Sequence, residues 1–201
     1  MTNRSKTVIL ASSSPRRAQL VRALGLTPRI IPSSADETFD PAMAPKDVVV
    51  HLARCKAEAV CAQLRNEAGQ VEGIVIGADT IVVIDGKILG KPVSPAHAVS
   101  MLLELQGRTH EVYTGLAVMD ASSGVMMADY RVTKVRMKAN SRQRLERYVA
   151  TGEPMDKAGA YGIQELGAVL VESIDGDYFT VVGLPVALLS DMLENFGVAV
   201  M

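Results

Sequence analysis

The stretch that decides the fold is Thr7-Val8-Ile9-Leu10-Ala11-Ser12-Ser13-Ser14-Pro15-Arg16-Arg17. Its first five residues are an apolar run, which predicts a buried strand. Ser14 suits the cap of a helix, and Pro15 suits the first helical position, where its missing N–H costs nothing. The chain therefore begins with a strand that turns directly into a helix.

Strands and helices continue to alternate beyond this junction. Helical patterns cover residues 45–65 and 95–105, the stretch from about 141 to 150, and the residues from Pro185 onward. Strand patterns cover 29–31, 74–76, 81–84, 111–119, 125–137, 168–171 and 178–182, and the polar stretch 65–72 predicts a loop. Gly77-Ala78-Asp79-Thr80 is expected to interrupt a strand. The alternation predicts an α/β fold with a mixed sheet, in a single domain over residues 1–201.

Composition excludes several classes of protein. The chain has 201 residues, 21 Lys and Arg against 22 Asp and Glu, and a net charge of -1. That balance argues against binding nucleic acid through bulk charge, and 4% aromatic content with no Trp argues against a base-stacking surface. No stretch has the length of a membrane span or the apolar segment of a signal peptide, so a cytoplasmic location is expected.

The strand-to-helix junction has the composition of an anion site. The hydroxyls of Ser12 and Ser14, the guanidinium groups of Arg16 and Arg17, and the N–H groups of the helix start converge there. The helix dipole favours negative charge at this end, so the junction suits a phosphate. It lacks the glycines and the Lys-Ser/Thr pair of a P-loop. A capped helix with two solvated arginines would give the same local sequence.

Three further charged residues are candidates for chemistry. Asp79 leaves an apolar run, where a carboxylate can hold a metal or activate water, although an Asp that only stabilises its own turn is the alternative. Lys91 lies between turn residues and could neutralise a phosphate or be exposed. Lys56 shares a helical row with apolar residues, so its ammonium either crosses the core edge or reaches out to solvent.

Other reactive groups lack a supporting pattern. The three histidines, at 51, 97 and 110, have no metal-ligand spacing, and no serine lies in a Gly-x-Ser-x-Gly elbow. His110 is expected to be a hydrogen-bonded structural group at the start of a strand. Cys55 and Cys61 fall on different faces of one predicted helix, so two reduced thiols are expected.

Seven motifs occur in an order that resembles the Maf family, from about residue 8 to residue 196. They are Ala11-Ser12-Ser13-Ser14-Pro15-Arg16-Arg17, Gly77-Ala78-Asp79-Thr80, Gly90-Lys91-Pro92, Gly107-Arg108-Thr109-His110, Gly152-Glu153-Pro154, the run from Asp156 to Gln164, and Gly183-Leu184-Pro185. The resemblance implies a nucleoside triphosphate pyrophosphatase that cleaves between the α- and β-phosphates with a divalent cation, Mg²⁺ or Mn²⁺. It also implies a curved mixed sheet with helices forming two lobes around a cleft, similar to the inosine triphosphate pyrophosphatases.

The resemblance also implies roles for individual residues. It assigns Asp79 as the proton acceptor, and its motifs match the branch that acts on dTTP and UTP, in which Arg16, Thr80 and Gln164 select the nucleobase. The glycine that usually follows Gln164 is Glu165 here. Phosphate-binding candidates are Ser12, Ser14, Arg17, Lys56 and Lys91. We expect Glu37 to join Asp79 as a metal ligand, because hard divalent cations prefer oxygen.

The expected role is the removal of unwanted nucleotides from the cellular pool, with a nucleoside triphosphate as partner and neither nucleic acid nor membrane. A homodimer is left open. The alternative is a nucleotide-binding regulator without turnover, linked to cell division or septum formation. Such a regulator would need the basic cluster but no acid at position 79. An enzyme with a broader range, which includes modified pyrimidine nucleotides, is a further alternative.

Overall fold

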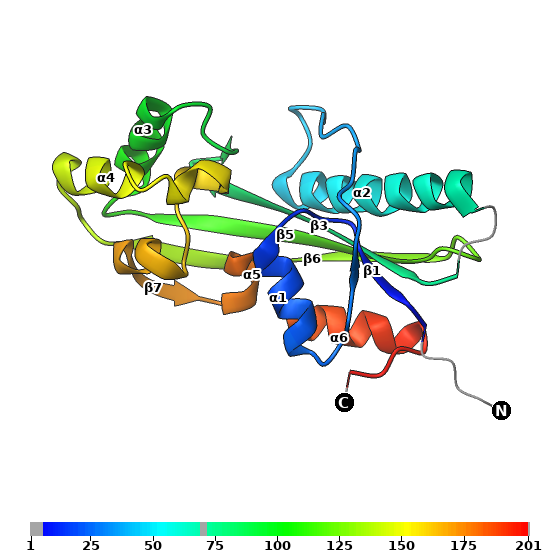
Figure 1. Cartoon of the computed structure of the whole chain (residues 1–201). Coiled ribbons are helices and arrows are strands. Elements are labelled where there is room, and N and C mark those ends of the chain that lie inside the picture. The colour runs from blue at the N-terminus through cyan, green and yellow to red at the C-terminus, as the bar shows by residue number, and fades with distance from the viewer. Residues whose placement is uncertain (1–5, 69–71, 201) are drawn as a thin grey trace. The chain divides into compact units, whose positions relative to one another are not determined.

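The computed structural model describes residues 6–68 and 72–200 (Figure 1). Within them the strands form one mixed sheet in the order β2-β1-β3-β5-β6-β7, with β4 paired to β3. The strands are β1 (Val8–Leu10), β2 (Arg29–Ile30), β3 (Ile74–Ile84), β4 (Lys87–Leu89), β5 (Thr109–Asp120), β6 (Met126–Met137) and β7 (Val171–Asp175). β1 runs parallel to β2 and β3, whereas β3–β4 and β6–β7 are antiparallel. The predicted mixed α/β class is confirmed.

Along the chain, the helices lie between these strands or follow the last of them, as the predicted alternation requires. They are α1 (Pro15–Ala23), α2 (Pro45–Ala68), α3 (Pro95–Leu105), α4 (Arg142–Val149), α5 (Tyr178–Val182) and α6 (Val186–Asn195), with short 3₁₀ helices η1 (Glu153–Asp156), η2 (Ala158–Ala160) and η3 (Glu165–Leu170). The predicted cap of α1 is confirmed, because Ser14 Oγ accepts a hydrogen bond from the Arg17 N–H and Pro15 is the first helical residue.

The chain divides into two compact units. The first unit contains the residues up to Asp79, residues 114–130 and the residues from Gly183 onward, and the second unit contains residues 80–113 and 131–182. β3, β5 and β6 each contribute residues to both units. A cleft between two lobes therefore stays a prediction, and the two units are described separately below.

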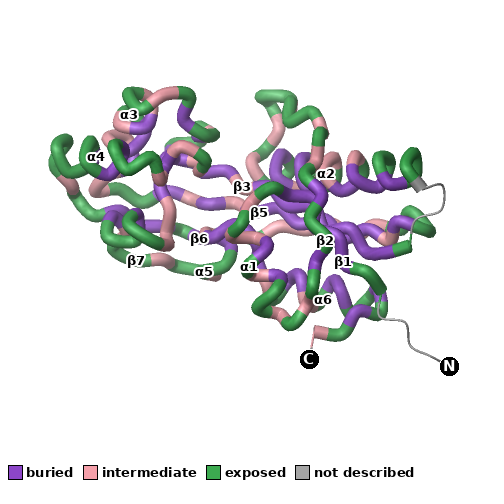
Figure 2. The backbone as a smooth tube through the Cα atoms, in the orientation of Figure 1, coloured by how far each residue is buried: buried purple, intermediate pink, exposed green. Residues whose placement is uncertain are grey.

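Strand periodicity organises the first unit. Side chains alternate across a strand, so Leu10 and Ile76 pack in a core with α1 and α6, whereas Ile9 and Val75 pack in a core with α2. Figure 1 shows α2 along one side of β1 and β3 and α6 on the other, and the buried positions in Figure 2 concentrate in these strands and on the helix sides that face them. Odd-numbered residues of β3 up to Asp79, those in the first unit, therefore point toward α2.

Two glycines allow α2 to lie directly on the sheet. A Cβ added to Gly77 would lie 2.2 Å from the Ala53 carbonyl oxygen, and one added to Gly115 would lie 2.1 Å from the Val49 carbonyl oxygen. No side chain fits at either position, because the neighbour is helix backbone. The prediction that Gly77-Ala78-Asp79-Thr80 interrupts a strand is wrong for this reason. β3 continues through it, and Gly77 marks a close approach of helix to strand.

The second unit has its own core. α3 and α4 pack with η2 and with inward-facing residues of four strands, such as Val82 of β3, Leu89 of β4, Val112 of β5 and Val135 of β6. The hairpin expected at Asp85-Gly86 joins β3 to β4, with Val83 opposite Ile88. This unit therefore forms around an interior separate from the two cores of the first unit.

Three sequence expectations about element boundaries are wrong. α2 continues to Ala68 instead of ending in a loop at residue 65. Residues 165–170 form η3, and the strand expected at 168–171 begins only at Val171. The strand expected at 178–182 is the helix α5, because the Asp177 carboxylate accepts hydrogen bonds from the Phe179 and Thr180 N–H groups at the helix start.

The structural role expected for His110 is confirmed. The side chain is buried in the second unit, with Nε2 2.7 Å from the Tyr161 hydroxyl, while Nδ1 is buried without a hydrogen-bond partner. Burial lowers the pKa of His110 from 6.5 to about 4, because the neutral imidazole is preferred away from water. Between these two values the unfolded chain binds a proton that the folded chain does not.

We therefore expect the free energy of unfolding to fall as the pH drops from 6.5 to 4, with a contribution of about 3 kcal/mol from His110. Urea unfolding of the wild type and of His110→Gln at several pH values in this window measures the contribution. The variant should lose most of the slope. A hydrogen bond from Ser122 holds the pKa of the Asp120 carboxyl below the ordinary value of 3.8, so Asp120 also destabilises the fold as the pH falls, mainly below 4, and by the same amount in both proteins. Equal slopes in the two proteins would show that His110 titrates normally in the folded chain.

Candidate functional site

Asp79 forms the centre of a charged cluster in the first unit. It lies on β3 at an odd-numbered position, so its carboxylate points toward α2, and the residue is only 8% exposed. The Lys56 ammonium on α2 lies 2.6 Å from Asp79 Oδ1 and 2.8 Å from Glu37 Oε1. One cation therefore bridges two carboxylates that come from distant parts of the chain.

The position of Lys56 follows from the helix periodicity. On α2 it extends the buried row that contains Val49, Ala53 and Val60, and its side chain is 12% exposed. The ammonium thus crosses the core edge, and the alternative in which it reaches out to solvent is wrong. The alternative for Asp79 is wrong as well, because the residue lies within a strand and its carboxylate pairs with a lysine from another element.

The guanidinium of Arg17 is held by the fold at the start of α1. Its Nε donates a hydrogen bond to the Gly183 carbonyl at 2.7 Å, and its Nη1 donates to Ser12 Oγ at 3.3 Å. The same Ser12 oxygen accepts from the Ser14 N–H at 3.2 Å. For Arg17, the alternative of a solvated arginine on a capped helix is therefore wrong. The junction predicted to bind phosphate contains a fixed cation.

The charges of Asp79 and Glu37 act on Arg17 at the start of α1. Burial lowers the pKa of Arg17 below its ordinary value, and nearby Arg16 lowers it further, whereas Asp79 and Glu37 raise it. Charges influence one another in this way only when they are close or share a poorly solvated surrounding. The first unit thus brings together the predicted residues Ser12, Ser14, Arg16, Arg17, Glu37, Lys56 and Asp79 in one region of alternating charge.

Three predicted site residues belong to the second unit. Thr80 follows Asp79 on β3, Lys91 is exposed in the loop after β4, and Gln164 is half-buried immediately before η3. Their grouping with the residues of the first unit around one nucleotide stays a prediction. Thr80 is tied to the charged cluster by its peptide bond to Asp79.

The two carboxylates fit a hard divalent cation. In the described part of the chain, no group of three or more His, Cys, Asp or Glu side chains could hold a metal by itself. Mg²⁺, however, is typically bound by one or two carboxylates, with water and substrate phosphates completing its shell. Glu37 and Asp79 offer such a pair, since both oxygens reach the same ammonium.

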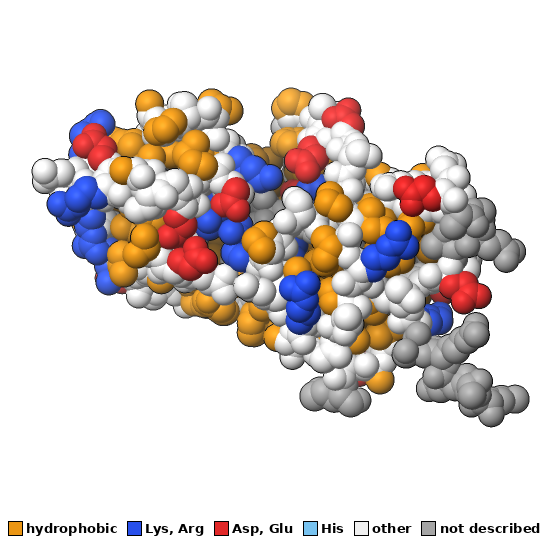
Figure 3. Space-filling view, viewed as in Figure 1, with side chains coloured by type: hydrophobic (Ala, Val, Ile, Leu, Met, Phe, Trp, Pro, Cys, Tyr) orange, Lys and Arg blue, Asp and Glu red, His pale blue; other side chains and the backbone are white. Residues whose placement is uncertain are grey.

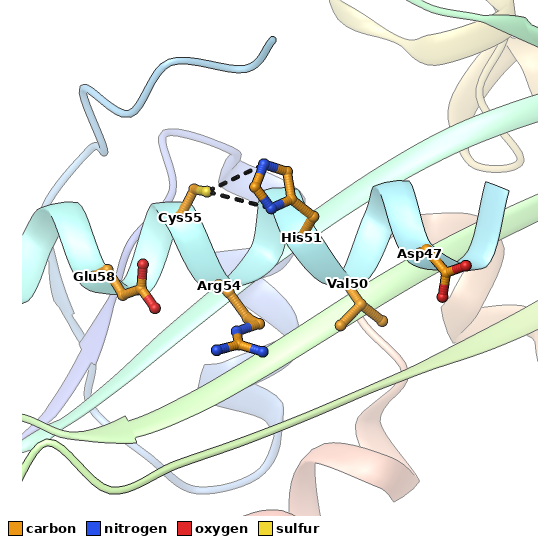
Figure 4. Close-up of a pocket in the computed structure, with 6 residues that line it drawn as sticks. All are labelled: Asp47, Val50, His51, Arg54, Cys55 and Glu58. Atoms are coloured by element: carbon orange, nitrogen blue, oxygen red, sulfur yellow. Dashed lines mark hydrogen bonds between the residues drawn. The ribbon is translucent and has the colours of Figure 1, made fainter. Parts of the chain in front are cut away.

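A separate hollow of about 410 Å³ lies along α2, lined by Asp47, Val50, His51, Arg54, Cys55 and Glu58 (Figure 4). Cys55 Sγ lies 3.6 Å from His51 Nε2. Burial raises the pKa of the Cys55 thiol above its ordinary value, which disfavours the reactive thiolate. None of the predicted site residues lines this hollow, and both cysteines of the chain are free, as expected.

Sequence reasoning missed the contacts that hold the site's loops. The carbonyl of Gly183 anchors Arg17 although 166 positions separate them, and no local pattern indicates such a contact. Glu153 and Tyr148 support the loop that carries Gln164. Glu153 was visible only as part of the Gly152-Glu153-Pro154 motif, and the buried face of α4 gave no signal that the Tyr148 hydroxyl has a partner.

The distribution of charge on the surface matches the nearly equal numbers of basic and acidic residues. Figure 3 shows basic and acidic side chains interspersed over the visible face, as expected for 21 basic and 22 acidic residues. Over residues 6–68 and 72–200, no helix combines the length and apolar character that crossing a membrane would need.

The fold and the charged cluster define an α/β protein in which the Asp79 carboxylate pairs with Lys56 and the first helix begins with a fixed arginine, Arg17. The chain belongs to the Maf-like protein family, whose sequence model matches residues 7–196. It is 49% identical over 193 residues to a dTTP/UTP pyrophosphatase of Desulforamulus reducens, covering 96% of this chain and 98% of the relative.

Other relatives are similarly close along their full length. A dTTP/UTP pyrophosphatase of Pelotomaculum thermopropionicum is 48% identical over 192 residues, covering 96% of this chain and 97% of that protein. One from Moorella thermoacetica is 49% identical over 193 residues, covering 96% of each. A solved dITP/XTP pyrophosphatase from Mycobacterium abscessus aligns with a TM-score of 0.39 and 14% identity, over 65% of this chain and 74% of that chain. That likeness is too weak to support a conclusion about this chain.

Proposed function

We propose that this chain hydrolyses dTTP and UTP to the nucleoside monophosphate and pyrophosphate, and so removes these nucleotides from the cellular pool. The observation that carries the proposal is the Asp79 carboxylate, fixed at 2.6 Å from the Lys56 ammonium. Family membership and relatives named dTTP/UTP pyrophosphatase, 48–49% identical to this chain, support the substrate class.

The residues of the first unit can supply what the reaction needs. Hydrolysis at the α-phosphate requires a water that loses a proton and positive charge that balances the negative charge of the transition state. Asp79 accepts the proton from the attacking water. Lys56 holds the Asp79 carboxylate in one orientation, and Arg17, fixed by the Gly183 carbonyl, binds the phosphates. Ser12 and Ser14 line the same helix start, and Lys91 is a further phosphate-binding candidate from the second unit.

A bound Mg²⁺ or Mn²⁺, held by Glu37 and Asp79, would supply additional positive charge to the triphosphate. Both carboxylates pair with Lys56 in the structure. The ammonium therefore lies beside the proposed cation site and adds to the positive charge that the phosphates would meet.

Nucleobase selection falls to Arg16, Thr80 and Gln164. The Gln164 amide offers one donor group and one acceptor, which can pair with the carbonyl and N–H on the edge of thymine or uracil. The structure gives a reason why glycine is usual at the next position. Glu165 has a φ of +55°, a conformation that costs a residue with a side chain roughly 1 kcal/mol. Glu165 therefore keeps the backbone shape and places a carboxylate beside Gln164.

Pyrophosphate release from a panel of nucleotides tests the proposal. We expect release from dTTP and UTP with Mg²⁺ or Mn²⁺, much less from dCTP and purine nucleotides, and a loss of at least about 100-fold when a chelator removes the cation. Saturable dTTP binding without release would instead identify the nucleotide-binding regulator. Equal rates with 5-substituted pyrimidine nucleotides would identify the broader enzyme. A cytoplasmic location and the lack of nucleic-acid and membrane partners stay predictions, and the formation of a homodimer stays open.

A further inference from the structure

The segment Gly162–Gly167, which carries Gln164, is held from inside the second unit by one carboxylate. Glu153 Oε1 accepts hydrogen bonds from the Tyr148 hydroxyl at 3.0 Å and from the Gly167 N–H at 3.0 Å. Its Oε2 accepts from the Leu166 N–H at 3.1 Å. Three donors thus converge on the two oxygens of a single side chain.

The other end of the segment is held by the same pair of residues. The Tyr148 hydroxyl accepts a hydrogen bond from the Gly162 N–H at 3.2 Å while it donates to Glu153. A Cβ added to Gly167 would lie 2.3 Å from the Gly162 carbonyl oxygen and 2.7 Å from the Tyr148 hydroxyl. The two ends of the segment therefore meet at Tyr148, with Gln164 on the loop between them.

Glu153 is itself fixed in place. Its N–H donates to Thr151 Oγ1 at 3.2 Å, and its carbonyl accepts a hydrogen bond from the Lys157 ammonium. That ammonium also lies 2.8 Å from Asp156 Oδ1, and the Lys157 side chain is only 10% exposed. A Cβ added to Gly162 would lie 3.0 Å from Lys157 Cε, so the lysine stem packs against the segment from another side. The carboxylate thus projects from a backbone held by its own hydrogen bonds into the loop that it supports.

We propose that Glu153, together with Tyr148, is a positioning residue for nucleobase selection: it holds the Gly162–Gly167 loop, and with it Gln164, in the one conformation that reads thymine or uracil. This inference rests on the proposed function and deepens it. A side-chain amide discriminates between bases only if its donor and acceptor are held in a fixed place. Glu153 does not touch the substrate and acts through Gln164.

The test compares the ratio of kcat/KM for dTTP to kcat/KM for dCTP in a set of variants. Glu153→Gln keeps the size of the side chain but places an NH₂ group against one of the three donors. We expect the ratio to fall at least about tenfold, mainly through a higher KM for dTTP, while kcat with dCTP stays within about threefold. Glu172→Gln changes an exposed carboxylate of the same unit and should leave the ratio unchanged.

Two further measurements separate positioning from a general loss of structure. Gln164→Ala should lower the ratio as Glu153→Gln does, and the double variant should lower it no further, because both changes remove the same interaction. Hydrogen exchange at the Leu166 and Gly167 amides should become at least about tenfold faster in Glu153→Gln, while α4 stays protected. Additive losses, or an unchanged ratio in a folded Glu153→Gln protein, would overturn the inference.

The inference and the proposed function can fail separately. If the wild type releases no pyrophosphate from any nucleotide, the proposed function fails, whereas amide exchange still tests whether Glu153 holds the loop. If the wild type prefers dTTP but Glu153→Gln keeps that preference, only the inference fails. If Glu153→Gln does not fold, Tyr148→Phe meets the same criteria with an expected loss of at least about threefold in the ratio, because it removes one of the three donors.

Discussion

Asp79→Asn is expected to lower kcat for dTTP at least about 100-fold, the loss typical of a missing general base. Asparagine has the size of aspartate and can still accept a hydrogen bond from Lys56, so the fold should be kept. It cannot take a proton from water at neutral pH. Single-turnover measurement of pyrophosphate release gives the chemical rate, and a thermal melt of the same sample checks that the variant is folded.

Asp191→Asn provides the matched control. It makes the same chemical change at an exposed carboxylate on α6 in the same unit, and its kcat should equal that of the wild type. Near-normal turnover by Asp79→Asn would remove Asp79 from the reaction and leave it as a structural partner of Lys56. A loss of folding in Asp79→Asn would lead to the same structural role.

Gly115→Ala is expected to have the largest effect on stability, at least about 3 kcal/mol. The new methyl group would lie 2.1 Å from the Val49 carbonyl oxygen and 2.8 Å from the Val50 nitrogen. Both are backbone atoms of α2, which cannot turn aside as a flexible side chain would. To relieve the overlap, the whole helix must move away from the sheet. Urea unfolding measures the loss.

Gly90→Ala is the control for this change, because a Cβ at Gly90 meets no atom within 4 Å. Its stability should differ from the wild type by less than about 1 kcal/mol. Since α2 carries Lys56, any Gly115→Ala protein that folds should also lose activity through the displaced ammonium. Wild-type stability in Gly115→Ala would show that α2 does not lie against β5 as the structure has it.

Local chemistry made much of the fold predictable. The cap at Ser14, the proline at the first helical position and the apolar run before them specify a strand and a helix through short-range effects. The errors have two causes. Tyr178–Val182 has β-forming residues, yet the carboxylate of the preceding residue, Asp177, starts a helix there through a local cap. At Gly77 a distant contact decides instead, because the close approach of α2 explains this glycine better than a turn does.

For the candidate site too, the sequence identified the residues but not their contacts. The sequence identified Asp79, Lys56 and Arg17 as candidates because charged residues next to apolar patterns are unusual. It left open whether each was buried or solvated. Strand and helix periodicity explain, after the fact, why Asp79 and Lys56 point toward each other across β3 and α2. The partners of Arg17 and Glu153 could not have been predicted, because a backbone carbonyl or N–H looks alike at every position.

By itself the amino-acid sequence determined the order of most elements, the family and the set of reactive groups, since these depend on residue type and on neighbours a few positions away. Only the tertiary structure decided which of those groups meet: Lys56 with two carboxylates, Arg17 with Gly183, and Glu153 with the loop of Gln164. The physical reason is that an ion pair or hydrogen bond forms only within about 3–4 Å, and the distances between residues far apart in the chain are set by how helices and strands pack.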